Sequence, residues 1–211
     1  MNINMMDIRN VRKMMSDMEK ISTQLRNRKK TGSYTYMVLD IETTKCRHII
    51  QIAYNIYDEF FNVVSKVDNI INEGIGKRDY YERFTLSEIY EQGKDVIDVL
   101  LELKKDMLKT KYIICHNVTF DLGNIYRYFN KYNIHISKKP IEVCTMKLSR
   151  KLCDCKDKNG KRKNPRLSEL YQYCFNELPS TTLAHTADYD VHITTKCFKY
   201  LVENNHFILK N

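Results

Sequence analysis

An acidic pair follows the first strongly apolar run of the chain. Asp40 and Glu42 come directly after 36–39, a run without helical spacing that is typical of a buried strand. Side chains two residues apart on a strand face the same side, so both carboxylates can converge on one point. Such carboxylates repel each other and are costly to desolvate unless a cation lies between them. Taken alone, the pair is more typical of a solvated strand end.

A second polar cluster, His116-Asn117-Val118-Thr119-Phe120-Asp121, follows the apolar run 111–115 and opens an expected helix. Thr119 is a good candidate for the N-cap, which would put Asp121 in the first turn, where the helix dipole favours a negative charge. Asp121 could therefore serve only the start of the helix. That interpretation does not explain why His116 and Asn117 crowd the same strand end.

A third cluster, His185-Thr186-Ala187-Asp188-Tyr189-Asp190, leads into the last expected helix. His185 precedes this helix and Asp190 lies in its early turns, so the two side chains can face one site. A lone histidine at a helix start is more often structural, and two acids in a first turn are common partners of the helix dipole.

Together the clusters predict a site for hard cations. Carboxylate oxygens are the ligands that Mg²⁺ and Mn²⁺ prefer. Two such ions can activate a water and stabilise the leaving oxygen when a phosphodiester is hydrolysed. A histidine titrates near neutrality, so His185 could accept the proton of that water. The candidate ligands are Asp40, Glu42, Asp121 and Asp190.

The three clusters resemble, in order and context, the three motifs of the DEDDh-type exonucleases of the DEDD superfamily. The first motif, Asp-x-Glu-Thr, matches Asp40, Glu42 and Thr43. The second, His-Asn-x-x-Phe-Asp, matches His116, Asn117, Phe120 and Asp121, and the third, His-x₄-Asp, matches His185 and Asp190. The similarity spans roughly residues 35–203. Three motifs in the right order are a far more specific signal than any one of them.

The resemblance implies an α/β fold of the ribonuclease H-like type, with a five-stranded mixed sheet flanked by helices. It implies a 3′→5′ exonuclease that releases nucleoside monophosphates from DNA or RNA, with two Mg²⁺ or Mn²⁺ ions on the four acids and His185 as general base. It places Thr43 at the 3′-terminal nucleotide, with supporting roles in substrate binding for Thr44, His116, Asn117 and Phe120. Asp188 is an extra acid that could replace Asp190 as a ligand, although the spacing from His185 favours Asp190.

The apolar pattern predicts the elements that must position these motifs. Short runs predict an opening meander of strands at 36–39, 49–53 and 61–67, followed by strands at 111–115 and near 141–144. Helices are expected over 85–108, 119–133, 145–152, 167–176 and 187–204. The apolar face of the first helix is assigned to Val96, Ile97, Leu100, Leu101, Leu103 and Leu108. This order is typical of a mixed sheet with helices on its faces.

Residues 1–33 differ from the rest of the chain. Ile8, Val11, Met15, Met18 and Leu25 mark one face of an amphipathic helix, and a basic run closed by Gly32 follows it. We expect an N-terminal helix and basic linker over 1–33 and one exonuclease domain over 34–211. The helix is expected to dock on the main domain; contact with a second copy in a homodimer, or with a polymerase partner, is the alternative.

Residues 153–166 are the most polar stretch, and six of them are Lys or Arg. Asn159-Gly160 predicts a tight turn and therefore a protruding hairpin or loop. Lys161, Arg162 and Lys163 could hold a phosphate backbone near the cleft, whereas a solvated surface loop explains the same residues equally well. Cys153 and Cys155 lack a second pair at the spacing of a zinc site, so zinc is not expected.

The bulk properties favour a nucleic-acid partner. The 211-residue chain has a formal charge of +9, which favours a polyanion, nucleic acid before membrane. No run approaches the ~20 apolar residues of a membrane span. The start of the chain lacks the apolar core of a secretory signal, and seven scattered cysteines are typical of a reducing compartment. We expect an intracellular protein of the cytoplasm or nucleus, or a viral protein in a host cell.

Two alternatives to an active enzyme remain open. One is a catalytically silent nucleic-acid-binding domain on the same fold, which the loss of a site acid would favour. The other is a proofreading subunit whose main role lies in a polymerase complex. The motifs do not distinguish DNA from RNA, although a 3′ end in a single strand is the expected substrate.

Overall fold

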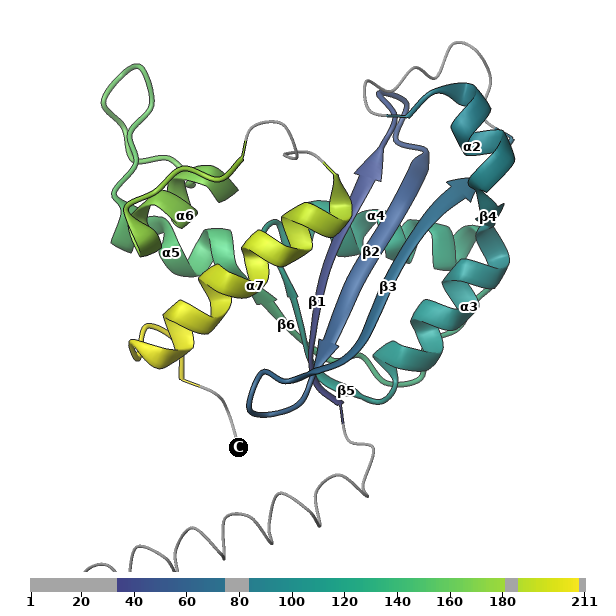
Figure 1. Cartoon of the computed structure of the whole chain (residues 1–211), viewed down its shortest axis with the longest axis horizontal. Helices are drawn as coiled ribbons and strands as arrows, with labels where there is room; N and C mark the ends of the chain where they lie inside the picture. The colour runs from purple at the N-terminus through teal and green to yellow at the C-terminus, as the bar shows by residue number, and fades with distance from the viewer. Residues whose placement is uncertain (1–33, 75–83, 181–185, 209–211) are drawn as a thin grey trace, which may run out of the picture. The chain divides into compact units, whose positions relative to one another are not determined.

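The computed structural model describes residues 34–74, 84–180 and 186–208. The predicted N-terminal helix and linker, and His185, lie outside these ranges, so their roles stay predictions. The described chain forms a mixed sheet in the order β4-β3-β2-β1-β5-β6 (Figure 1). Its strands are β1 (Tyr34–Thr43), β2 (Ile49–Tyr57), β3 (Val63–Asn72), β4 (Lys94–Asp95), β5 (Thr110–Cys115) and β6 (Ile141–Cys144).

The sheet confirms the expected ribonuclease H-like architecture, with one strand more than expected. β1, β2 and β3 form the antiparallel meander, and β5 and β6 run parallel to β1. The added strand is the two-residue β4, which pairs in parallel with the end of β3. β3 begins at Val63 rather than at Phe61, because Phe61 lies in the turn before the strand with a φ of 61°.

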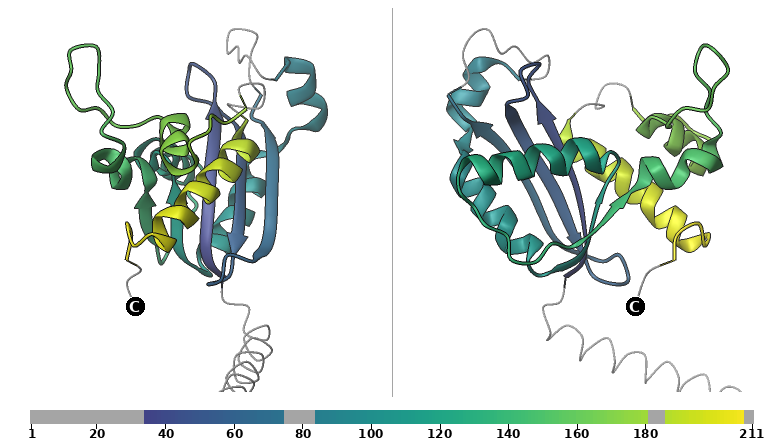
Figure 2. Two further views of the ribbon diagram at one scale, coloured as in Figure 1. Left: turned by 60° about the vertical axis from the view of Figure 1, so that its left-hand side comes forward. Right: turned by 180° about the vertical axis from the view of Figure 1, so that it is seen from behind.

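Helices cover both faces of the sheet, as Figures 1 and 2 show. They are α2 (Leu86–Gln92), α3 (Val96–Met107), α4 (Val118–Lys131), α5 (Thr145–Cys153), α6 (Leu167–Phe175) and α7 (Ala187–Glu203). One core cluster joins α3 and α4 to one face, and a second joins α7 to the other. Among the described helices, none is long and apolar enough to cross a membrane.

The single helix predicted over 85–108 is wrong, because the chain breaks at Gly93. A side chain there would meet the carbonyl oxygen of Ile89 at 2.3 Å and the backbone nitrogen of Asn72 at 2.8 Å. The end of β3 therefore approaches too closely for any residue but glycine. After the break the chain pairs with β3, and Asp95 caps α3 by accepting from the amide of Ile97 at 2.8 Å.

The buried face of α3 differs from the predicted one. Val96, Leu100 and Leu103 are buried as expected. The predicted face is wrong for Ile97, Leu101 and Leu108, which are 41%, 47% and 37% exposed. Val99 and Met107 are buried instead.

Strand β1 alternates between the two core clusters, and this alternation fixes the direction of its acids. Met37, Leu39 and Ile41 pack in the cluster with α3 and α4, whereas Tyr36 and Val38 pack in the cluster with α7. Residues of the same parity share a face, so Asp40 and Glu42 lie on the side of α7.

Candidate active site

The acidic end of β1 extends beyond its parallel neighbour. Val38 is in register with Ile114, and β5 ends one residue later at Cys115. The strand edge from Asp40 onward therefore has no β5 partner, while on its other side Asp40 still pairs with Ala53 of β2. Because β5 ends before the two acids, side chains from the helices can approach them on this side of β1.

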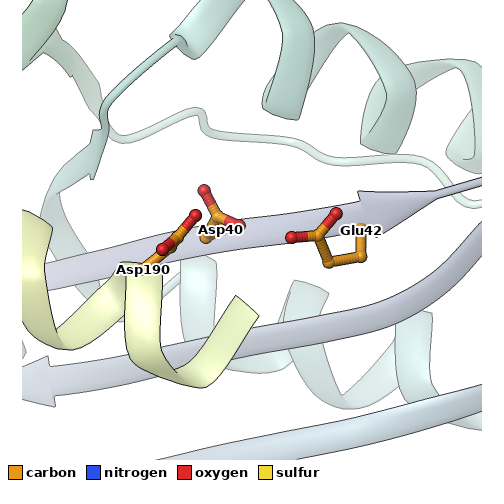
Figure 3. A group of neighbouring side chains, drawn as sticks. All are labelled: Asp40, Glu42 and Asp190. Atoms are coloured by element: carbon orange, nitrogen blue, oxygen red, sulfur yellow. The ribbon is translucent and has the colours of Figure 1, made fainter. Parts of the chain in front are cut away.

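α7 brings Asp190 to the pair on β1, as predicted. Oxygen atoms of Asp40, Glu42 and Asp190 all lie within 4.8 Å of one another, and Figure 3 shows the three carboxylates grouped between β1 and the first turns of α7. Asp188 is exposed and stands outside this group. The geometry therefore favours Asp190 over Asp188 as the third acid, because residues two apart on a helix point in different directions.

Asp121 enters the same region from the first turn of α4 and is only 2% exposed. Desolvation raises its pKa to about 8, although hydrogen bonds from the backbone of Asn117 and Ile41 oppose that rise. Its Oδ2 atom is buried and has no hydrogen-bond partner. A buried carboxylate oxygen without a donor is unfavourable unless a cation or another group completes it.

The electrostatics of the cluster fit a divalent cation. Burial raises the pKa of Asp40 well above its usual range, and the charges of Asp121, Asp190 and Glu42 raise it further. Four acids gathered at one site destabilise one another when all are ionised. Oxygen ligands of this kind suit Mg²⁺ or Mn²⁺, so the residues present fit the ions that the sequence predicts.

One residue that positions the site escaped the sequence analysis. Gln51 is 3% exposed on β2 and pairs with Glu42 across the strands. Its Oε1 accepts from the amide of Ala187 at 3.0 Å, and its Nε2 donates to Asp68 at 2.8 Å. The bond to Ala187 ties the first residue of α7 to the sheet. A glutamine inside the apolar run 49–53 is the signal that could have revealed it, because buried polar side chains need partners.

Both ring nitrogens of His116 have hydrogen-bond partners within the protein, and its predicted role in substrate binding stays a prediction. The ring is 3.1 Å from the carbonyl oxygen of Pro165 through Nε2 and 3.0 Å from Thr145 Oγ1 through Nδ1. Desolvation lowers its pKa to about 4, so the ring is neutral at physiological pH. A carbonyl only accepts, which makes Nε2 the protonated nitrogen and Thr145 the donor to Nδ1. His116 thus joins the end of β5 to α5 and to the segment before α6.

The two threonines after Glu42 differ in their surroundings. Thr44 is 2% exposed, and its Oγ1 accepts from the amide of His48 at 3.1 Å. It therefore closes the β1–β2 turn, and its contact with substrate stays a prediction. Thr43 ends β1 at a register shift and is half-buried, so its contact with the terminal nucleotide stays a prediction.

The second motif places its remaining residues at the start of α4. Asn117, not Thr119, occupies the N-cap position, and its side chain makes no capping hydrogen bond. Asn117 and Phe120 line a surface cavity of about 440 Å³. Phe120 is 40% exposed although it directly precedes the buried Asp121. Both residues are thus accessible beside the acidic cluster, as substrate-binding residues must be.

The basic segment forms the predicted hairpin, which projects from the rest of the fold (Figure 1). Lys156 and Arg162 form an antiparallel bridge, and Gly160 takes a φ of 74° in the turn. Arg162 pairs with Asp154 at 2.7 Å and Lys163 pairs with Glu169 at 2.6 Å. Among the three predicted phosphate-binding residues, Lys161 is therefore the one without a carboxylate partner in the described part of the chain.

Comparison with known proteins places this fold and site in one class. The chain belongs to the exonuclease family RNase_T, which it matches over residues 37–198, and through it to the DEDD superfamily. The match includes every acid of the cluster.

Individual relatives agree with this class. Over 125 residues the chain is 26% identical to the PolC-type DNA polymerase III of Streptococcus pyogenes serotype M18 (strain MGAS8232), a match that covers 56% of the chain and 8% of that relative. The fold resembles crystal structures of E. coli Exonuclease I. The complex with a dA16 oligonucleotide has a TM-score of 0.62 at 17% identity, and the complex with dT13 has 0.61 at 18%. Both matches cover 81% of this chain and 41% of that one.

Proposed function

We propose that this protein is a metal-dependent 3′→5′ exonuclease that removes nucleoside monophosphates from the 3′ end of DNA or RNA. The observation that carries the proposal is the convergence of Asp40, Glu42 and Asp190 within 4.8 Å of one another. The buried, unpartnered oxygen of Asp121 lies on α4, and the charge of Asp121 helps to raise the pKa of Asp40. Family membership supports the nuclease chemistry, and the likeness to Exonuclease I, solved with oligonucleotides, supports a single-stranded substrate.

The four acids would hold two divalent cations, Mg²⁺ or Mn²⁺, which when bound activate a water and neutralise the charge that develops on the phosphate. In the reaction the oxygen of this water bonds to phosphorus and the bond from phosphorus to the 3′ oxygen breaks. The products are a nucleoside 5′-monophosphate and a strand shortened by one nucleotide, whose 3′ oxygen takes up a proton. We assign the role of general base for the water to His185, on the spacing of the third motif.

The intact acidic cluster favours an enzyme over a silent binding domain. A domain that only binds nucleic acid gains nothing from four clustered carboxylates, which repel both one another and the phosphate backbone. A proofreading role is the second candidate, and the match to a PolC-type polymerase favours it. The comparisons give no support for a homodimer.

The test is a time course on oligonucleotides labelled at the 5′ end, with Mg²⁺, with Mn²⁺ or with EDTA. The proposal expects a ladder that shortens from the 3′ end only when metal is present, and loss of that ladder in Asp40→Ala and His185→Ala. A substrate with a blocked 3′ hydroxyl should resist. Cleavage that starts internally, or a protein inert with both metals on DNA and RNA, would overturn the proposal.

A further inference from the structure

A cavity of about 440 Å³ lies between the β1–β2 turn and the first turns of α4. One wall holds Arg47, which follows Glu42 by five residues, and the other holds Phe120, which immediately precedes Asp121. Both walls therefore continue directly from the segments that carry the acids. The volume falls in the range of roughly 300–1,000 Å³ that is usual for small-molecule sites and suits one nucleotide unit.

The described residues give the cavity a positive charge without a compensating acid. Among them, the lining contains two arginines, Arg47 and Arg127, and no Asp or Glu. The ion pairs found among the described residues include neither arginine. Two guanidinium groups without a carboxylate partner are a good match for a phosphate, which they can bind through paired hydrogen bonds.

Arg127 is held in place by neutral groups. Its Nη2 donates to the backbone carbonyl of Arg47 and, at 3.1 Å, to Oδ1 of Asn124. Asn124 is itself buried, and its Nδ2 donates to the carbonyl of Phe120 at 2.8 Å. One chain of hydrogen bonds thus fixes Arg127 relative to both walls, and it leaves the positive charge available to a ligand.

The backbone of the turn is also specialised. Arg47 takes a φ of 64°, in the left-handed region that residues other than glycine and asparagine rarely adopt. The turn is closed by hydrogen bonds from Thr44 to the carbonyl of His48 at 2.8 Å and from Arg47 to the carbonyl of Thr44 at 2.9 Å. A long cationic side chain at such a position points to a role for that side chain rather than for the turn.

Gly123 lines the cavity and adds no side chain to it. It lies inside α4, where glycine is unfavourable. A Cβ atom built at this position meets nothing within 4 Å. The fold therefore does not require glycine here, and the missing side chain leaves space beside Phe120.

We propose that this cavity binds one nucleotide unit of the substrate strand, with its phosphate between Arg47 and Arg127 and its base against Phe120. The assignment rests on the proposed exonuclease function, and it adds a subsite that the acidic cluster does not provide. Stacking on an aromatic ring tolerates any base, so the cavity would add affinity without selecting a sequence.

The experiment separates this subsite from catalysis. Binding of a short fluorescent oligothymidylate is measured by anisotropy in EDTA at several salt concentrations, for the wild type and for Arg47→Ala. This change leaves in place the Arg47 carbonyl that holds Arg127. We expect roughly tenfold weaker binding and a slope of log affinity against log salt reduced by about 0.7, the value for one phosphate contact on a single strand. Lys105→Ala removes the same charge from α3, near the opposite end of the sheet, and should bind like the wild type.

Gly123→Leu provides an independent test, because it adds a side chain to the cavity lining at a position where a Cβ atom meets no protein atom within 4 Å. We expect KM to rise several-fold more than kcat falls, with a Tm no lower than that of the wild type; Gly123→Ala serves if the larger side chain prevents folding. Wild-type affinity and salt slope in Arg47→Ala, or a wild-type KM in the glycine variant, would overturn the subsite. If the wild type degrades DNA and these variants match it, the subsite alone is wrong; an inactive wild type refutes the proposed function instead.

Discussion

The backbone amide of Ala187 donates to the side-chain oxygen of Gln51 across 3.0 Å, and this buried hydrogen bond fixes the start of α7 on β2. The amide nitrogen of the same side chain donates to Asp68 at 2.8 Å. An N–H group can only donate and a carboxylate can only accept, so one orientation of Gln51 satisfies both partners. Asp190 follows three residues after Ala187, and its position depends on this link.

Replacing Gln51 by leucine should therefore damage both stability and catalysis. The change leaves the buried amide of Ala187 and one oxygen of Asp68 without their partner, which costs roughly 1–3 kcal/mol. We also expect kcat to fall while oligonucleotide affinity in EDTA stays close to that of the wild type. The cationic cavity is lined by the β1–β2 turn and α4, and neither Gln51 nor α7 contributes to it. Urea denaturation and single-turnover kinetics measure the two effects. A variant that is destabilised but fully active would show that α7 does not need this bond to place Asp190.

Asp190 and Asp188 offer a matched pair of substitutions on the same helix. Asp190→Asn removes a carboxylate from the acidic cluster and should lower kcat by at least about a hundredfold, since metal ligands contribute several kcal/mol to the transition state. Asp188→Asn removes the same charge from an exposed position and should change kcat by roughly twofold at most. Steady-state rates with Mg²⁺ compare them. Equal losses in the two variants would contradict the assignment of Asp190 as the ligand.

The raised pKa values predict an unusual pH dependence for the metal-free protein. Desolvation raises the pKa of Asp121 to about 8 and moves that of Asp40 in the same direction, whereas an unfolded aspartate has a pKa of about 3.9. The folded state therefore holds more protons than the unfolded state between about pH 4 and pH 8. Stability contributed by these groups is complete below this window and is lost as the pH rises through it.

Divalent cations should reverse this trend, because they bind the ionised carboxylates and displace protons. We expect the rise in Tm on adding Mg²⁺ to grow between mildly acidic and mildly alkaline pH. Asp121→Asn should weaken both the pH dependence without metal and the response to Mg²⁺. Thermal denaturation across the window, with EDTA and with Mg²⁺, measures each effect. A metal-free protein that gains stability steadily up to pH 8 would contradict the prediction.

Local patterns in the sequence were sufficient to predict the acidic cluster. The period of two on β1 puts Asp40 and Glu42 on one face, and the place of Asp190 in the first turn of α7 follows from the expected start of that helix. Each prediction uses residues that are neighbours in the chain. The added strand β4 and the break at Gly93 depend instead on the close approach of Asn72, which no local pattern reports.

The hydrogen-bond partners of the polar residues near the site were harder to predict for the same reason. His116 bonds to the carbonyl of Pro165, which is 49 residues away in the sequence, so its position in the second motif gave no sign of a structural role. Thr44 appears equivalent to Thr43 in the sequence, yet the β1–β2 turn buries it. Gln51 was overlooked because one polar residue hardly alters an apolar run. Partners supplied by distant segments decide which polar residues remain available to a substrate.

The basic residues of the hairpin near 156–162 are of two kinds: some form ion pairs within the fold, and others are available to bind phosphate. Arg162 and Lys163 pair with Asp154 and Glu169, whereas Lys158 and Lys161 are exposed and in the described chain form no such pair. The double change Lys158→Ala and Lys161→Ala should weaken single-strand binding and lower its salt dependence by about 0.7 for each phosphate that the variant no longer neutralises. Tm should not change, because neither side chain stabilises the fold.

Arg162→Ala is the matched control. It removes one exposed ion pair worth roughly 0–1 kcal/mol and should alter the salt slope less than the double variant does. If the double variant binds as the wild type does at low salt, the hairpin is a solvated loop rather than part of the nucleic-acid surface.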